Sequence, residues 1–125
     1  MPTTRSVTIE EVHSAARAIA GRWNGHPTEL AAVYGIPRGG LVPAGIVASE
    51  LGLPLTSDPR PQADTLVVDD LVDSGATVAP YMEAGTPVDA LYRKTWAPLT
   101  SPATVDGDPW LIFPWEATST TGGPT

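Results

Sequence analysis

The stretch Thr65–Thr77, which reads TLVVDDLVDSGAT, decides how the rest of the chain is interpreted. Four residues typical of a β-strand lead into two adjacent acids, Asp69 and Asp70. A loop of small, hydroxyl and acidic residues follows, and then a predicted helix. Backbone N–H groups in such a loop converge on phosphate groups, which the positive end of a helix dipole also attracts. The residues predicted to cradle the phosphate are Ser74, Gly75, Ala76 and Thr77.

The two adjacent carboxylates extend this prediction beyond a phosphate. Asp69 and Asp70 are suited to sugar hydroxyls and to a hydrated Mg²⁺, which proteins bind mainly through water. The sequence contains no Gly-Lys-Ser/Thr, so this is not a Walker loop. The plainer alternative is a buried strand with a tight polar turn, although such turns need no pattern of three acids. A ligand with a sugar, a phosphate and a metal would satisfy the whole loop.

Two acids, a third acid at Asp73 and then Ser-Gly-x-Thr after an apolar strand resemble the 5-phosphoribosyl-1-pyrophosphate (PRPP) motif of type I phosphoribosyltransferases. This resemblance implies a three-layer, Rossmann-like α/β fold with a short parallel sheet. It also implies Mg²⁺ as the cofactor. The expected partners are PRPP and a purine base or nucleoside monophosphate.

The remaining chain reads as alternating helices and strands, which favours a parallel sheet with both faces covered. The predicted helices are Val7–Trp23 with Thr8 as N-cap, Leu41–Leu51 closed by Gly52, and Ala76–Ala84, in which Pro80 either makes a kink or sets a late start. The predicted strands are Leu30–Tyr34, Leu66–Val68, Val88–Tyr92 and Leu111–Phe113. Ligands of such sheets bind at the carboxyl ends of the strands.

A second glycine loop, Tyr34–Leu41 (YGIPRGGL), also joins a predicted strand to a helix. Arg38 can bind a phosphate through two hydrogen bonds, and Gly39 and Gly40 would expose N–H groups where the helix starts. An exposed turn is the alternative for this segment taken alone. The loop resembles the pyrophosphate loop of the same family, in which the peptide bond before the basic residue is often cis. We therefore expect a cis Pro37–Arg38 bond.

The third feature is a base-recognition pattern. Lys94 follows a predicted strand, and Trp110 opens the aromatic segment Trp110–Glu116. An aromatic face and a donor to a carbonyl oxygen would together select a 6-oxopurine over adenine. The alternative is that the tryptophans are ordinary core or interface residues and that Lys94 is a solvated lysine at the end of a strand.

The order of these features from Val7 to Glu116 resembles the bacterial branch of the family that acts on xanthine and guanine. This resemblance implies a role for each residue. Asp73 would be the general acid/base near purine N7, and Asp69 and Asp70 would hold the ribose hydroxyls and the metal. Arg38 and Gly39 would contact pyrophosphate. The phosphate loop named above would hold the 5′-phosphate. Lys94 would contact O6, Trp110 would stack on the base, and the backbone of Ile112 would lie beside the exocyclic N2 position.

One departure from the family is large. Relatives carry a long flexible hood between the second helix and the PRPP strand, whereas only Pro54–Asp64 occupies that gap here. Lids exclude water from reactive intermediates. Two interpretations therefore compete: a transferase with a reduced loop, and a module that binds PRPP or a nucleotide without turnover. Retention of Asp73, Lys94 and Trp110 favours the transferase.

Composition excludes several other classes of protein. The chain has 125 residues and a net charge of −7, which argues against nucleic-acid binding. It has no cysteine, so disulfides and thiol chemistry are excluded. We expect a cytoplasmic protein, since no signal peptide or membrane span is evident. We also expect a homo-oligomer, one domain over 1–116 with a small C-terminal base-binding segment, and a disordered tail over 117–125.

Overall fold

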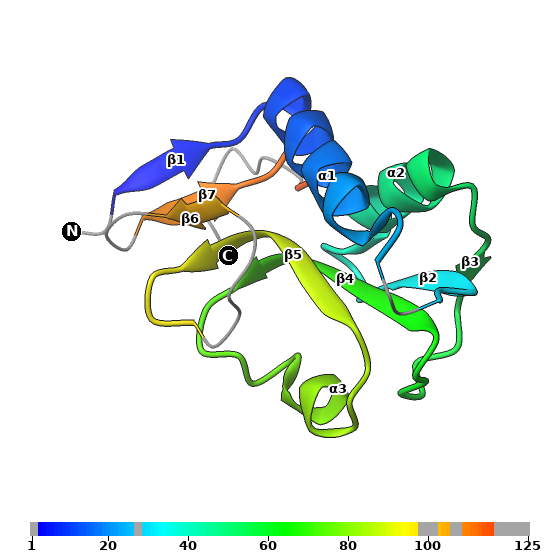
Figure 1. The fold of residues 1–125 in the computed structure, drawn as a ribbon. Coiled ribbons are helices and arrows are strands. Elements are labelled where there is room, and N and C mark those ends of the chain that lie inside the picture. Colours follow the sequence, from blue (N-terminus) through cyan, green and yellow to red (C-terminus); the bar gives the residue numbers. More distant parts are fainter. Residues whose placement is uncertain (1–2, 27–28, 98–102, 106–108, 117–125) are drawn as a thin grey trace.

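The computed structural model describes residues 3–26, 29–97, 103–105 and 109–116. Its centre is a five-stranded sheet in the order β3-β2-β4-β5-β6, in which every neighbouring pair is parallel (Figure 1). A separate two-stranded sheet pairs β1 with β7, also in parallel. The strands are β1 (Thr4–Ser6), β2 (Ala32–Gly35), β3 (Leu55–Thr56), β4 (Thr65–Val72), β5 (Val88–Lys94), β6 (Ala103–Val105) and β7 (Trp110–Ile112). The helices are α1 (Ile9–Trp23), α2 (Leu41–Leu51) and α3 (Ala79–Glu83).

The elements form three layers, as the sequence predicts. Helices α1 and α2 lie on one side of the sheet, and α3 lies on the other (Figure 1). The main core fills the space between the sheet and the first two helices, and Val12, Val47 and Leu66 are fully buried there. A smaller cluster, which includes Val72, Val78 and Ala97, packs near the carboxyl end of β4. The α/β class and the parallel sheet are confirmed.

Local sequence signals explain the two long helices. The Thr8 side chain accepts a hydrogen bond from the Glu11 N–H, and the Glu11 carboxylate accepts one from the Thr8 N–H, both at 3.1 Å. This reciprocal capping fixes the start of α1 at Ile9, two residues later than predicted. Helix α2 has the predicted limits, and Gly52 ends it in the left-handed conformation with φ of 68°.

Five predicted elements need correction. Strand β4 runs from Thr65 to Val72 instead of ending at Val68, so Asp69 and Asp70 lie within the strand, and β5 ends at Lys94 instead of Tyr92. Helix α3 covers only Ala79–Glu83 instead of 76–84, because Pro80 falls in its first turn and residues 74–78 form turns. Strand β2 begins at Ala32 instead of Leu30. The last strand is Trp110–Ile112, and it pairs with β1 instead of joining the main sheet.

The structure describes every residue of the short connection between α2 and β4. It contains β3, followed by a loop in which the Arg60 guanidinium donates to the Asp58 carboxylate. This guanidinium holds the pKa of Asp58 at about 2. The Tyr81 hydroxyl of α3 donates to the Pro59 carbonyl at 2.9 Å. The segment in the place of the hood is therefore held against α3.

Two further predictions concern the outer parts of the chain. The tail predicted over 117–125 lies outside the described residues. In the part of the chain that the structure describes, no helix has the length and apolar character needed to span a membrane.

Candidate active site at the carboxyl ends of the strands

The phosphate loop encloses a small cavity directly after β4. Its volume is about 120 Å³. The lining residues are Asp69, Leu71, Val72, Asp73, Ser74, Gly75, Ala76, Thr77 and Val78. Gly75 has φ of 88°, a conformation that favours glycine, and it lets the chain turn inside the loop. All four residues predicted to cradle a phosphate line this one cavity.

The structure corrects how that loop would hold a phosphate. Helix α3 begins at Ala79, so the loop residues precede the helix instead of forming its first turn. The Ala76 N–H donates to the Ser74 hydroxyl at 3.3 Å. Any phosphate contact therefore comes from the turns of the loop and not from the end of a long helix.

The acidic pair combines burial with like charge. The Asp69 side chain is almost fully buried at the start of the cavity, whereas Asp70 is half-buried. Burial raises the pKa of the Asp69 carboxyl to about 7, and the negative charge of Asp70 contributes to the rise. One Asp69 oxygen accepts the Asp70 N–H at 2.8 Å. A cation or several hydroxyl donors at this point would relieve the repulsion between the two carboxylates.

The second glycine loop lies against this acidic pair. A Cβ atom added to Gly39 would fall on the Asp70 carboxylate, so only glycine fits the observed arrangement. The Ile36 N–H donates to the Val68 carbonyl at 3.0 Å, which ties the loop to β4. The Pro37–Arg38 bond is cis, as expected, and Arg38 is exposed beside it. The Gly40 N–H is not exposed as predicted, because it donates to the Ile36 carbonyl at 2.8 Å.

Asp73 has a partner that sequence reasoning missed. The Trp96 indole Nε1–H donates to Asp73 Oδ1 at 2.8 Å, across 23 residues of sequence. Trp96 lies two residues after Lys94, and this closeness to a predicted site residue is the one sequence signal that could have indicated the contact.

Lys94 links this pair to the C-terminal segment. Its side chain is buried at the end of β5, and Nζ donates to the Pro109 carbonyl at 2.7 Å. The same nitrogen lies 5.9 Å from the centre of the Trp96 ring. Pro109 immediately precedes Trp110, so Lys94 binds the backbone directly beside the residue predicted to stack on the base.

The other two residues of the base-binding prediction have structural roles of their own. Trp110 is 44% exposed on β7. The Ile112 carbonyl accepts the Val7 N–H at 2.8 Å, although a carbonyl oxygen has a second lone pair for another donor. Burial raises the pKa of Glu116, and the Asp70 charge adds to this effect.

The donor set fits a Mg²⁺ ion held jointly with a substrate. Two adjacent carboxylates, Asp69 and Asp70, supply oxygen ligands, and Mg²⁺ usually completes its shell with water and substrate phosphates. Within the described ranges, no three His, Cys, Asp or Glu side chains gather as a metal-binding group.

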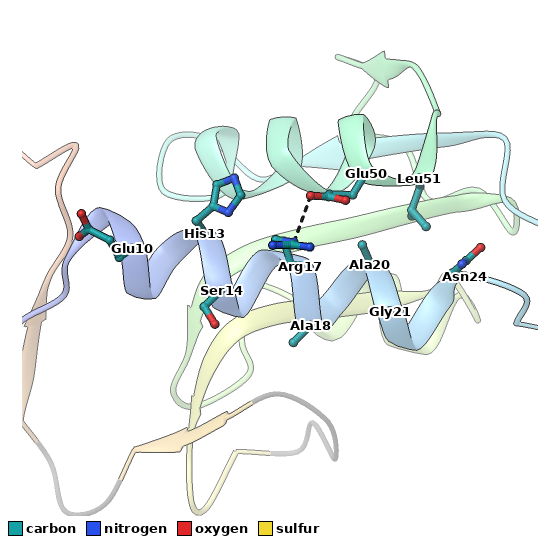
Figure 2. Close-up of a pocket in the computed structure, with 10 residues that line it drawn as sticks. All are labelled: Glu10, His13, Ser14, Arg17, Ala18, Ala20, Gly21, Asn24, Glu50 and Leu51. Atoms are coloured by element: carbon teal, nitrogen blue, oxygen red, sulfur yellow. Dashed lines mark ion pairs between the residues drawn. The ribbon is translucent and has the colours of Figure 1, made fainter.

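A larger hollow, of about 750 Å³, lies elsewhere, between α1 and α2 (Figure 2). Arg17 on α1 and Glu50 on α2 form an ion pair across it at 3.3 Å. None of the predicted site residues lines this hollow. The smaller cavity after β4 is therefore the candidate active site, since it holds the predicted chemistry.

Comparisons with known proteins agree with this geometry. The chain is 33% identical to a xanthine-guanine phosphoribosyltransferase of Cereibacter sphaeroides over an aligned stretch of 146 residues, which covers 88% of this chain and 85% of the relative. That stretch is longer than the chain itself, so the relative carries residues with no counterpart here. No family model matches the sequence.

Solved structures share the fold. A purine phosphoribosyltransferase of Pyrococcus horikoshii superposes with a TM-score of 0.72 and 22% identity, over 96% of this chain and 99% of that one. The xanthine-guanine-hypoxanthine phosphoribosyltransferase of Helicobacter pylori gives a TM-score of 0.69 and 18% identity, over 90% and 93% of the two chains.

The fold and the acidic phosphate loop define a type I phosphoribosyltransferase. The similarity to the Cereibacter enzyme is more specific. This chain belongs to the xanthine-guanine phosphoribosyltransferase family of purine phosphoribosyltransferases.

Proposed function

We propose that this protein transfers the 5-phosphoribosyl group of PRPP to a 6-oxopurine, releases pyrophosphate and serves purine salvage. The observation that supports the proposal is the cavity at the carboxyl end of β4, which is lined by Asp69, Asp73 and a phosphate-sized loop and has Asp70 directly beside Asp69. The Cereibacter relative is a xanthine-guanine phosphoribosyltransferase, which supports the same substrate class.

In the proposed reaction, N9 of the purine attacks C1′ of the ribose while the bond from C1′ to the pyrophosphate oxygen breaks. The base enters with its proton on N7, and Asp73 accepts that proton as N9 becomes bonded. Asp69 and Asp70 hold the ribose hydroxyls, and Arg38 and Gly39 hold the departing pyrophosphate. Bound Mg²⁺ supplies positive charge that stabilises the leaving group.

The base would be selected by the end of β5 and the C-terminal segment. At the end of β5, the Lys94 ammonium donates to the Pro109 carbonyl, and a purine O6 is the acceptor we assign to it in the complex. The 6-amino group of adenine is itself a hydrogen-bond donor, so it cannot accept a hydrogen bond from the Lys94 ammonium. Trp110 supplies an exposed ring for stacking, and guanine, xanthine or hypoxanthine are therefore the proposed bases.

The test is a direct assay. The protein is mixed with PRPP, Mg²⁺ and each of guanine, xanthine, hypoxanthine and adenine, and both pyrophosphate and nucleotide are measured. At a saturating concentration of base, the proposal predicts equal formation of both products with 6-oxopurines and little of either with adenine. The Asp73→Asn variant is the matched control, and it should bind PRPP but turn over more slowly. Tight PRPP binding without turnover on any base would instead favour a binding module.

A further inference from the structure

Trp96 stands between the two side chains that the proposed reaction assigns to the base. Its indole N–H donates to Asp73 on one side, and its ring lies 5.9 Å from Lys94 Nζ on the other. Asp73 follows β4 and Lys94 ends β5, so Trp96 connects two neighbouring strands at their carboxyl ends.

The turn that carries Trp96 is fixed on both sides. Lys94 is buried, and its carbonyl accepts the Ala97 N–H at 3.0 Å. Ala97 packs in the small cluster with Val72 and Val78, which also line the phosphate cavity. The backbone on each side of Trp96 is therefore anchored to the walls of the site.

The hydrogen bond between Trp96 and Asp73 lies at the surface and is not part of the core. Trp96 is 54% exposed and Asp73 is exposed, so burial does not force the two side chains together. A single hydrogen bond between exposed groups adds little to stability, because water competes for both partners. What the bond does fix is the orientation of a carboxylate that would otherwise rotate freely. Because Trp96 occupies Oδ1, the second oxygen is left to accept a proton from a bound base.

We infer that Trp96 is a positioning residue for Asp73 in the transfer reaction. This inference rests on the proposed function. Trp96 restricts the Asp73 carboxylate before the base arrives, and positional errors of about 1 Å at such a group can lower rates about a hundredfold. The effect should therefore appear in kcat more than in PRPP binding.

The first experiment examines the bond without any ligand. In ¹⁵N-labelled protein, the Trp96 indole N–H resonance is assigned by its loss in Trp96→Phe. Asp73→Ala should move this resonance by more than it moves the indole resonances of Trp23 and Trp110. An unmoved Trp96 resonance would overturn the inference, whatever the enzymatic activity.

The second experiment measures the role. Trp96→Phe keeps a ring but removes the N–H, and we expect kcat with guanine to fall at least about tenfold while KM for PRPP stays within about twofold. Trp23→Phe is the matched control, because it removes an indole N–H bonded to Asp89, away from the site. Its kcat should match the parent protein at a temperature where both are folded.

A double-mutant comparison then shows whether Trp96 acts through Asp73. In an Asp73→Ala background, Trp96→Phe should have no further effect on kcat, since the carboxylate it positions is gone. If the double variant instead lost kcat by the product of the two single-variant losses, the positioning role would be overturned. Parent activity in Trp96→Phe would overturn it too while leaving the proposed function intact, whereas an inactive parent protein would refute both.

Discussion

Gly39 and Asp70 lie in contact, and this contact joins the two loops that the site requires. The loop after β2 reaches the acidic pair within β4 so closely that the position of a Gly39 Cβ is already filled by the Asp70 carboxylate. In the proposed complex, the pyrophosphate and the ribose of one PRPP molecule would lie on either side of this contact.

Replacing Gly39 by alanine should therefore impair binding more than folding. The new Cβ would displace the Asp70 carboxylate, a short side chain that can rotate away, so we expect the free energy of unfolding to change by about 1 kcal/mol or less. PRPP affinity should fall about tenfold or more, as measured by calorimetry with Mg²⁺ present. Gly45→Ala is the control: it lies within α2 with nothing within 4 Å, and it should stabilise slightly without affecting PRPP. Equal PRPP affinity in both variants would contradict the prediction.

Asp69 should make the ligand-free protein less stable as the pH rises. Its pKa is about 7 in the folded state against an ordinary value of 3.8, so the folded protein keeps this proton when the unfolded chain has lost it. This contribution to stability is complete below about pH 4 and disappears as the pH rises through about 7. Urea unfolding between pH 5 and pH 8 should show the decline, with a slope of at most about 1.4 kcal/mol per pH unit. Asp69→Asn should reduce that slope, and an unchanged slope would show that Asp69 is not its source.

Lys94 should control the choice of base. Lys94→Met keeps an apolar stem in the buried position but removes the donor, so discrimination of guanine over adenine should fall by about tenfold or more. The measurement is kcat/KM for each base at saturating PRPP. Arg17→Met removes a positive charge from the α1 surface and should leave the preference unchanged. An intact preference in Lys94→Met would place base selection elsewhere.

Asp89 should matter for stability and not for chemistry. It is fully buried, and it accepts hydrogen bonds from the Arg22 guanidinium and from the Trp23 indole. Asp89→Ala should lower the free energy of unfolding by about 1–3 kcal/mol, because it removes the hydrogen bonds from the partly exposed Arg22 and takes away the acceptor of the Trp23 indole N–H. Glu50→Gln, which breaks the exposed pair with Arg17, should cost about 1 kcal/mol or less in the same denaturant titration. Similar losses in both would contradict this ranking.

The reduced loop should affect the fate of PRPP. Residues 52–64 form a short connection held to α3 by the Tyr81 hydroxyl, in the gap where the family resemblance implies a hood. Since lids protect reactive intermediates from water, we expect pyrophosphate release to exceed nucleotide formation as the base concentration is lowered. A ratio that stays at one, with fast turnover, would show that this connection suffices.

Local patterns predicted most of the fold. Helix α2 was predictable to the residue because an apolar run lies between Gly40 and Gly52, and the start of α1 depends on a capping pattern within four residues. The strands β1, β3 and β6 were not predicted. Each has two or three residues, and their stability comes from partners far away in the sequence.

The same distinction holds for the site. The segment Asp69–Thr77, which runs from the end of β4 into the phosphate loop, is contiguous, so the residues that line the cavity could be predicted. The bond between Trp96 and Asp73 depends on how the turn after β5 packs against β4, which no local pattern encodes. The role of Pro109 as partner of Lys94 was missed for the same reason.

The pairing of β1 with β7 has a consequence for how the molecule is made. Thr4 lies opposite Trp110, so the first strand has no partner until almost all of the described chain has left the ribosome. The strands β2, β4 and β5 are complete much earlier, and the phosphate loop is already part of that portion. The side of the site assigned to the base is thus assembled last. A nascent chain would therefore complete the phosphate loop before it completes the segment assigned to base recognition.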